Sequence, residues 1–270
     1  MTDTTPLSSS DHRSGLNFIT ATVREIIRPS ASLARIVLHI PGLRDDDTWH
    51  RPNVSLRFYL GADFGDVSRV YTVRSASHEA ETIDVDVVLH GVESPMMSWF
   101  RSLEIGHTVS LDGPRPHFQI PDPRGRRVAA FADDTSIPAL FAILSAANGE
   151  LTGTAFIATD DIEAFDELPR DTGLDLVRIA PGRGFDEQAQ IVDDAAGWVI
   201  WGAGERDEMK SLRRHFRGAM GIDKADVAVY GYWKRGVSTS DIDAVRLRHY
   251  TELLAAGGTV TEMDDLALDI

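Results

Sequence analysis

A chain of 270 residues is longer than one ordinary domain, so two domains are the expected organisation. With 43% apolar and 26% charged residues it is typical of a folded globular protein, which excludes disordered and collagen-like classes. The excess of 42 acidic over 27 basic residues gives a formal net charge of -15. That charge disfavours nucleic acid and anionic membrane surfaces as partners.

The sequence contains no cysteine, which excludes disulfides, thiolate metal sites and cysteine-ligated iron-sulfur clusters. Redox chemistry would therefore need an organic cofactor or a non-thiolate metal. The nine histidines show no short ligand spacing, so no protein-bound metal is expected. Residues 1–15 are polar and predict a disordered tail rather than a signal peptide, and the apolar stretch Ile137–Ala147 is too short to span a bilayer. We expect a cytoplasmic protein.

Residues 16–125 are predicted to form an antiparallel β-barrel. Short segments rich in Val, Ile, Thr, Phe and Tyr alternate with Gly, Pro, Asp and Ser clusters, as in small barrels and sandwiches. Ser94 followed by Pro95 predicts the N-cap and first position of a short inserted helix. The expected strands are Phe18–Ile27, Leu33–Ile40, Ser55–Leu60, Arg69–Arg74, Ile83–His90 and Thr108–Leu111.

Residues 126–238 show a different pattern, which begins after the linker Pro121–Arg126. Near-continuous apolar strands alternate with helices, which predicts a doubly wound parallel α/β sheet with a ligand at the carboxyl ends of its strands. The expected strands are Val128–Ala132, Thr154–Thr159, Leu174–Ile179, Trp198–Trp201 and Val227–Tyr230. The expected helices are Ser136–Ala147, Ile162–Leu168, Phe185–Val192 and Glu205–Ala219. Residues 239–270 are predicted to form a helix, Ser240–Ala256, and an acidic tail.

The hexapeptide Arg69-Val70-Tyr71-Thr72-Val73-Arg74 carries groups that suit a flavin. A guanidinium can bind a diphosphate, an aromatic ring can stack on a flat heterocycle, and a hydroxyl can hydrogen-bond its polar edge. A barrel strand with solvated arginines would show the same alternation. The hexapeptide resembles the Arg-x-Tyr-Thr-x-Arg flavin motif of the siderophore-interacting protein family, the ferric-siderophore reductases related to ferredoxin reductases.

The resemblance extends from Asn17 to Gly236 through motifs in the order of that family. They are Val88–Gly91, Asp112–Arg115, Ala132–Ala139, Trp201–Glu205 and Gly231–Gly236. The resemblance implies a ferredoxin reductase-like fold, with a β-barrel FAD-binding domain followed by an α/β NAD(P)H-binding domain.

For the flavin, the resemblance implies that Arg69 holds the diphosphate, Tyr71 lies against the isoalloxazine and Thr72 lies near N5. Tyr71 and Thr72 are thus the expected catalytic residues. Further expected FAD-binding residues are Val73, Arg74, His90, Gly91, Pro95, Met97, Ser98 and Trp99. Met96 and Met97 stand where the family has small residues, so they either weaken or shift flavin binding or pack the helix on the barrel.

For the electron donor, Asp133, Thr135, Pro138, Gly204 and Glu205 are expected around a nicotinamide nucleotide. Arg183 is the expected ligand for the 2'-phosphate of NADPH, whereas Asp160 and Asp161 would favour NADH. Tyr232 and Trp233 are expected near the flavin. Arg115, Lys234 and Arg235 are expected to bind substrate, and with Arg69, Arg74 and Arg183 they would form a positive cleft for anionic ligands.

The resulting expectation is an FAD-dependent ferric-siderophore reductase that passes electrons from NADPH or NADH to chelated Fe(III) and releases Fe(II). A ferredoxin is an alternative donor. A general flavin or ferredoxin-type reductase of the same fold and a non-catalytic siderophore-binding module are alternative functions.

Overall fold

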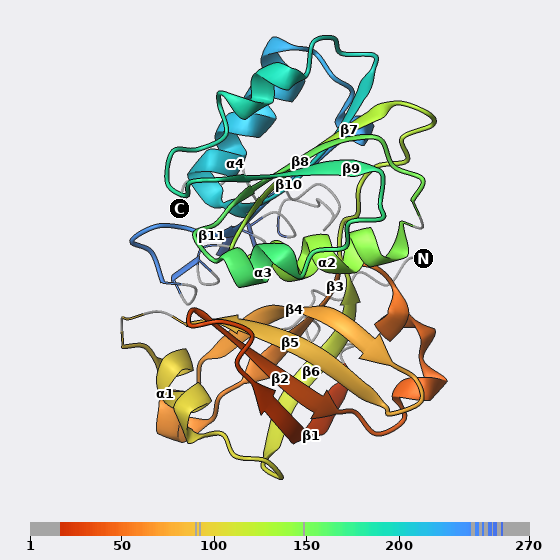
Figure 1. Cartoon of the computed structure of the whole chain (residues 1–270). Helices are drawn as coiled ribbons and strands as arrows, with labels where there is room; N and C mark the ends of the chain where they lie inside the picture. Colours follow the sequence, from red (N-terminus) through yellow and green to blue (C-terminus); the bar gives the residue numbers. More distant parts are fainter. Residues whose placement is uncertain are drawn as a thin grey trace, which may run out of the picture.

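The computed structural model describes residues 17–89, 91, 93–147 and 149–238, together with residues 241, 242, 245, 248, 249, 251, 252 and 255. It shows a β-barrel stacked against a parallel α/β domain (Figure 1). The predicted tail 1–15, the acidic tail 262–270 and His90 lie outside the described residues. Within the predicted helix 240–256, the described residues are helical.

Six antiparallel strands close the barrel in the order β1-β2-β5-β4-β3-β6. Alternate residues of these strands, such as Ile36 and Leu38 or Leu56 and Phe58, point inward and are fully buried. The antiparallel barrel predicted from the sequence is confirmed. The strands are β1 (Phe18–Ile27), β2 (Leu33–His39), β3 (Val54–Tyr59), β4 (Ser68–Ser77), β5 (Thr82–Val88) and β6 (Thr108–Pro116).

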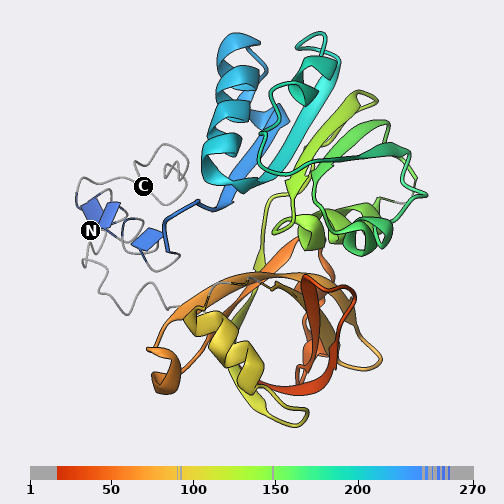
Figure 2. The same cartoon turned by 60° about the vertical axis from the view of Figure 1, so that its left-hand side comes forward.

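One α-helix, α1 (Pro95–Ser102), lies against the side of the barrel (Figure 2). As predicted, Ser94 is its N-cap and Pro95 stands in its first turn. Met96, Met97 and Trp99 are buried in the barrel core, where the Trp99 ring lies 5.2 Å from that of Phe58. Packing therefore accounts for both methionine side chains. Shorter 3-10 turns are η2 (Leu43–Asp45), η3 (Asp47–His50) and η4 (Ala62–Phe64).

The second domain is a five-stranded parallel sheet in the order β11-β10-β7-β8-β9. Helices α2 and α3 lie between the sheet and the barrel, and α4 covers the opposite face (Figure 1). This arrangement confirms the predicted doubly wound domain. The strands are β7 (Arg127–Asp133), β8 (Gly153–Ala158), β9 (Leu174–Ile179), β10 (Trp198–Glu205) and β11 (Val227–Trp233). The helices are α2 (Ile137–Ala146), α3 (Ile162–Asp166), α4 (Arg206–Arg213), the π-helical η6 (Arg214–Ala219) and the 3-10 turns η5 (Gln188–Ile191) and η7 (Lys224–Asp226).

Two predicted helices differ from the structure. The segment 185–192 forms only the 3-10 turn η5, and Phe185, which precedes it, is buried in the core with its ring 5.5 Å from that of Phe131. The predicted helix 205–219 begins one residue later, because Glu205 is the last residue of β10 and caps α4. After Arg213 it continues as the π-helical η6. No helix in the described part of the chain is long and apolar enough to cross a membrane.

A buried charge cluster joins the two domains. Arg35 on β2 and Arg74 on β4 both bind Asp86 on β5, with N–O distances of 2.7 and 3.3 Å. Both guanidinium groups also reach Glu167, which follows α3, at 2.6 and 2.9 Å. The Arg74 guanidinium lies 3.5 Å from the centre of the Phe141 ring of α2. Arg74, which the sequence placed at the flavin, is thus built into the domain interface.

Replacing Arg74 by alanine tests this structural role. The change leaves the fully buried Asp86 carboxylate with one cation fewer and removes the contact with Phe141. We expect a loss of about 3 kcal/mol in the free energy of unfolding, measured by urea denaturation without added FAD. Arg44→Ala, which removes an exposed ion pair with Glu81, is the control and should leave the urea midpoint unchanged. An unchanged midpoint for Arg74→Ala would contradict the role.

Candidate functional site

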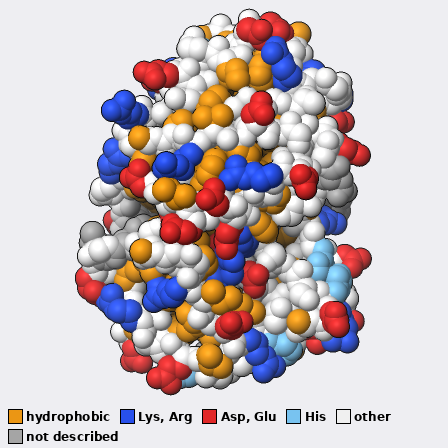
Figure 3. Space-filling view, in the orientation of Figure 1, with side chains coloured by type: hydrophobic (Ala, Val, Ile, Leu, Met, Phe, Trp, Pro, Cys, Tyr) orange, Lys and Arg blue, Asp and Glu red, His pale blue; other side chains and the backbone are white. Residues whose placement is uncertain are grey.

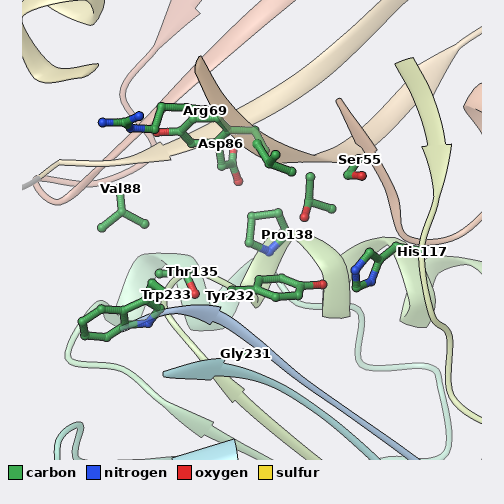
Figure 4. Close-up of a pocket in the computed structure, with 13 residues that line it drawn as sticks. Ser55, Arg69, Asp86, Val88, His117, Thr135, Pro138, Gly231, Tyr232 and Trp233 are labelled. Carbon is green, nitrogen blue, oxygen red and sulfur yellow. The ribbon is translucent and has the colours of Figure 1, made fainter. Parts of the chain in front are cut away.

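Two adjoining cavities of about 250 and 680 Å³ lie between the barrel and the parallel sheet. Residues from both domains line them, and five residues are common to both: Arg69, Tyr71, Val88, Thr135 and Trp233. Figure 4 shows the smaller cavity, with Arg69 and Asp86 on the barrel side and Pro138, Tyr232 and Trp233 on the side of the parallel sheet. The cavities therefore bring the first predicted motif next to the carboxyl ends of the strands of the second domain.

The residues of the β4 hexapeptide have separate surroundings. Arg69 and Tyr71 face the cavities, and burial raises the pKa of the Tyr71 hydroxyl. Thr72 lines the smaller cavity. Val73 is in the barrel core, and a bulge between Val73 and Ser75 turns Arg74 toward the domain interface. Three of the five predicted flavin residues of this strand are thus presented to the cavities.

Tyr232 closes the inner end of the smaller cavity. Burial raises the pKa of its hydroxyl, and hydrogen bonds with Asn53 and Thr72 oppose that shift. Its ring meets that of His117 edge to face, with a centroid distance of 5.6 Å, and its hydroxyl end is directed toward His117 (Figure 4). Tyr232 therefore connects Thr72 with the last strand of the sheet.

The start of α1 forms one wall of the larger cavity. The Ser94 hydroxyl accepts a hydrogen bond from the backbone N–H of Met97 at 3.2 Å, and Pro95 occupies the first turn. Ser98 turns away to donate to Glu93 at 2.6 Å, while Trp99 is buried in the core. Gly91 is exposed with open space around it. Of the predicted binding residues described in this region, only Met97 lines the larger cavity, together with Ser94 and Met96.

The buried carboxylate of Asp133 ties together the ends of three strands. It accepts hydrogen bonds from the Thr135 backbone and hydroxyl at 3.0 and 2.6 Å, from the Glu205 backbone at 2.8 Å and from the Trp233 indole at 2.7 Å. Gly204 has φ +153, and a Cβ there would come within 2.6 Å of this carboxylate. Glycine is therefore required at 204 by both conformation and space.

Glu205 is also fully engaged. One carboxylate oxygen accepts hydrogen bonds from the backbone N–H groups of Asp207 and Glu208, which caps α4. The other accepts a hydrogen bond from the backbone N–H of Arg235 at 3.0 Å. The predicted Glu205 site and the Gly231–Gly236 motif are therefore parts of one hydrogen-bonded edge. Pro138 stands in the first turn of α2 and lines the smaller cavity.

Three cations of the predicted positive cleft have carboxylate partners in the structure. Lys234 pairs with Asp207 at 3.2 Å, Arg235 with Glu208 at 3.6 Å, and Arg115 with the buried Asp112. Arg183 is exposed and lies outside the linings of both cavities, although its neighbours Pro181 and Gly182 line the larger one. The prediction considered only the cations, whereas in the structure Arg115, Lys234 and Arg235 each pair with a carboxylate.

Comparison with known proteins follows the same division of the chain. The profile of the "Siderophore-interacting FAD-binding domain" matches residues 59–118, and that of the "Siderophore-interacting protein" matches residues 125–236. The ferric acinetobactin reductase of Acinetobacter baumannii is 34% identical, and the alignment covers 97% of this chain and 94% of that protein. The chain belongs to the siderophore-interacting protein family.

Two further relatives agree with this assignment. The ferric vibriobactin reductase ViuB of Vibrio cholerae is 26% identical over an alignment that covers 63% of this chain and 65% of that protein. The solved structure of the siderophore-interacting protein from Acinetobacter baumannii has a TM-score of 0.82 at 32% identity, covering 88% of this chain and 99% of that one. The predicted family and fold are thus confirmed.

The siderophore-interacting fold of this chain offers suitable groups for FAD. The larger cavity has room for an extended ligand and combines a guanidinium from Arg69, aromatic rings from Tyr71 and Trp233, and the capped start of α1. The smaller cavity adds the hydroxyls of Thr72 and Ser55. This donor set fits a flavin dinucleotide.

Several site residues are not apparent from the sequence. Asn53, which is buried and adopts φ 56, donates to the Phe118 carbonyl at 2.6 Å and hydrogen-bonds Tyr232. His117 and Asp86 line the smaller cavity. Pro52-Asn53 is typical of a turn, but no local pattern indicates that this turn reaches the last strand of another domain.

The wall of the larger cavity at the edge of the parallel sheet is rich in carboxyl groups. Burial raises the pKa values of Asp133, Asp134 and Glu208 above the ordinary range, and nearby carboxylates add to the shift of Asp134 and Glu208. Asp160 and Asp161 are among the groups that act on Asp134. Folding thus disfavours the charged forms of these carboxyl groups, which costs stability wherever they ionise.

Asp134→Asn should remove part of that cost. A carboxyl group whose pKa is raised by folding binds its proton more tightly in the folded state, so it stabilises the fold less as pH rises above its ordinary value of 3.8. We expect the variant to have a higher thermal midpoint at neutral pH and a weaker decline in stability as pH rises. Asp175→Asn, on the exposed surface of β9, is the control. A lower midpoint for Asp134→Asn at neutral pH would contradict this account.

Proposed function

We propose that this protein is an FAD-dependent ferric-siderophore reductase that takes electrons from NADH or NADPH. The observation that carries the proposal is the shared cavity, in which Arg69 and Tyr71 of the barrel face the carboxyl ends of β7, β8 and β11. The names of the two curated relatives support the reaction, since both are ferric-siderophore reductases. The alignment with ferric acinetobactin reductase covers nearly the whole chain, which disfavours the alternative of a non-catalytic siderophore-binding module.

Each wall of the cavity has a distinct task in this proposal. The Arg69 guanidinium would pair with the FAD diphosphate, and the start of α1 would face the nucleotide half. Tyr71 and Trp233 would supply flat apolar surfaces for the isoalloxazine, while Thr72, held by Tyr232, would direct its hydroxyl to the polar edge. When bound, FAD accepts a hydride from a two-electron donor and returns single electrons, which a one-electron Fe(III) acceptor requires.

The donor would reach the cavity at the carboxyl edge of the sheet. Thr135 and Pro138 stand between β7 and α2, where this class of fold binds dinucleotides. Asp133 fixes Thr135 and Trp233 relative to each other, so it acts on the donor site through its hydrogen bonds. One reduced nicotinamide supplies electrons for two Fe(III) ions and yields one proton. The resulting Fe(II) is held less tightly by hard oxygen ligands than Fe(III), so reduction releases it.

Turnover under anaerobic conditions tests the function. FAD-loaded protein is mixed with NADH or NADPH and a ferric siderophore, and Fe(II) is trapped with a coloured chelator. We expect Fe(II) to appear in proportion to protein, with about two equivalents per nicotinamide consumed. Flavin reduction by either nucleotide without Fe(II) formation would contradict the proposal and favour a general flavin reductase. If only a reduced ferredoxin supports Fe(II) formation, the ferric siderophore remains the acceptor but NADH and NADPH are wrong as the electron donor.

Substitutions of Arg69 and Thr72 are predicted to impair different steps, FAD binding and Fe(III) reduction. Arg69→Ala should weaken FAD binding about tenfold or more, measured by flavin fluorescence titration, because a charge-assisted contact with the diphosphate is lost. Thr72→Val keeps the side-chain shape, so it should retain FAD but slow Fe(III) reduction about tenfold or more. Arg127→Ala, an exposed cation at the start of β7, is the matched control for Arg69→Ala. Equal FAD affinity in the Arg69 and Arg127 variants would contradict the assignment.

A further inference from the structure

The charges around the larger cavity determine which chelates can approach it. Of the described residues that line this cavity, four carry carboxyl groups, Asp133, Asp134, Glu205 and Glu208, and three carry cations, Arg69, Lys234 and Arg235. Lys234 and Arg235 are already paired with Asp207 and Glu208 on α4. Under the proposed function Arg69 is committed to the FAD diphosphate. The cavity therefore holds no surplus of positive charge for an anionic substrate.

The charge of the whole chain acts in the same direction. The formal net charge of -15 produces a negative field at distances beyond the cavity, which slows the approach of anions and speeds that of cations. On the face shown in Figure 3, basic and acidic side chains are interspersed and form no large basic patch. The local and long-range contributions agree in sign.

We propose that the acceptors of this reductase are ferric chelates of zero or positive net charge, and that multiply anionic chelates such as tris-catecholates are poor substrates. This inference rests on the proposed function, because it concerns the acceptor of that reaction. Neutral chelation by hydroxamates, or mixed chelation that includes a basic nitrogen group, meets the requirement. Lys234 and Arg235 then stabilise the fold of the last motif rather than attract the substrate.

A matched series of chelates separates charge from coordination chemistry. Ferrioxamine B carries a free ammonium group, and its N-acetyl and N-succinyl forms are one and two charges more negative with the same trihydroxamate iron centre. At about 10 mM ionic strength we expect kcat/KM to be roughly tenfold higher for the cationic than for the anionic form. At about 0.5 M salt the difference should fall below roughly twofold, because the anionic form speeds up and the cationic form slows down.

Binding provides a readout that does not depend on turnover. The Ga(III) forms of the three chelates cannot be reduced in this reaction, so titration of FAD-loaded protein with each one, followed by tryptophan fluorescence, measures affinity alone. The order of affinity should be the same as the order of kcat/KM. A preference for the anionic chelate at low ionic strength that salt abolishes would overturn the inference.

Two carboxylate variants distinguish the local from the overall charge. Asp207 pairs with Lys234 but does not line the cavity, so Asp207→Asn should free the Lys234 ammonium and raise kcat/KM for the anionic chelate about threefold. Asp175→Asn removes the same charge from the far strand β9 and should change it by much less. Equal effects of the two variants would overturn the assignment to Lys234. If chemically reduced, FAD-loaded protein reduces none of the three chelates, the reductase function itself fails instead.

Discussion

The buried charge cluster of Arg35, Arg74, Asp86 and Glu167 sets the relative position of the two domains. Asp86 has no side-chain exposure, and both guanidinium groups bind its carboxylate, so losing either cation would be costly. Those guanidinium groups also bind Glu167 of the second domain, which makes the interface part of the charge balance. Asp86 lines the smaller cavity as well, so the interaction that joins the domains is continuous with the wall of the proposed flavin site.

A second buried carboxylate organises the other wall. Asp133 accepts hydrogen bonds from residues at the ends of β7, β10 and β11, and Gly204 leaves the space that its side chain fills. Tyr232 and Trp233 line the same cavity as Tyr71 and Thr72 of strand β4. Several residues of the family motifs therefore determine the shape of the cavity through their contacts with one another. Under the proposed function, a smaller set that includes Arg69, Tyr71, Thr72 and Trp233 would contact the ligand directly.

Local patterns predicted those features that depend on local physics. The bounds of β1 and β9 and the Ser94 cap followed from alternation and turn chemistry over a few residues. The ion pairs of Arg74, Lys234 and Arg235 could not be predicted from local patterns. Their partners Glu167, Asp207 and Glu208 lie on other elements, which only the tertiary fold brings close. The π-helical end of α4 and the short η5 turn likewise depend on packing against the sheet. Motif residues indicated where the site lies, whereas the carboxylates that pair with Arg74, Lys234 and Arg235 lie outside the motifs.

Under the proposed function, electrons leave a flavin in the interdomain cavity for chelated Fe(III). The most direct measurement is the oxidative half-reaction: FAD-loaded protein is photochemically reduced without oxygen and mixed rapidly with a neutral ferric trihydroxamate, while the visible absorbance of oxidised flavin is followed. We expect this absorbance to return at a rate that rises with chelate concentration and is slowed by Thr72→Val. Protein that takes up no FAD, or reduced flavin that stays bleached in the presence of the chelate, would contradict the proposed function.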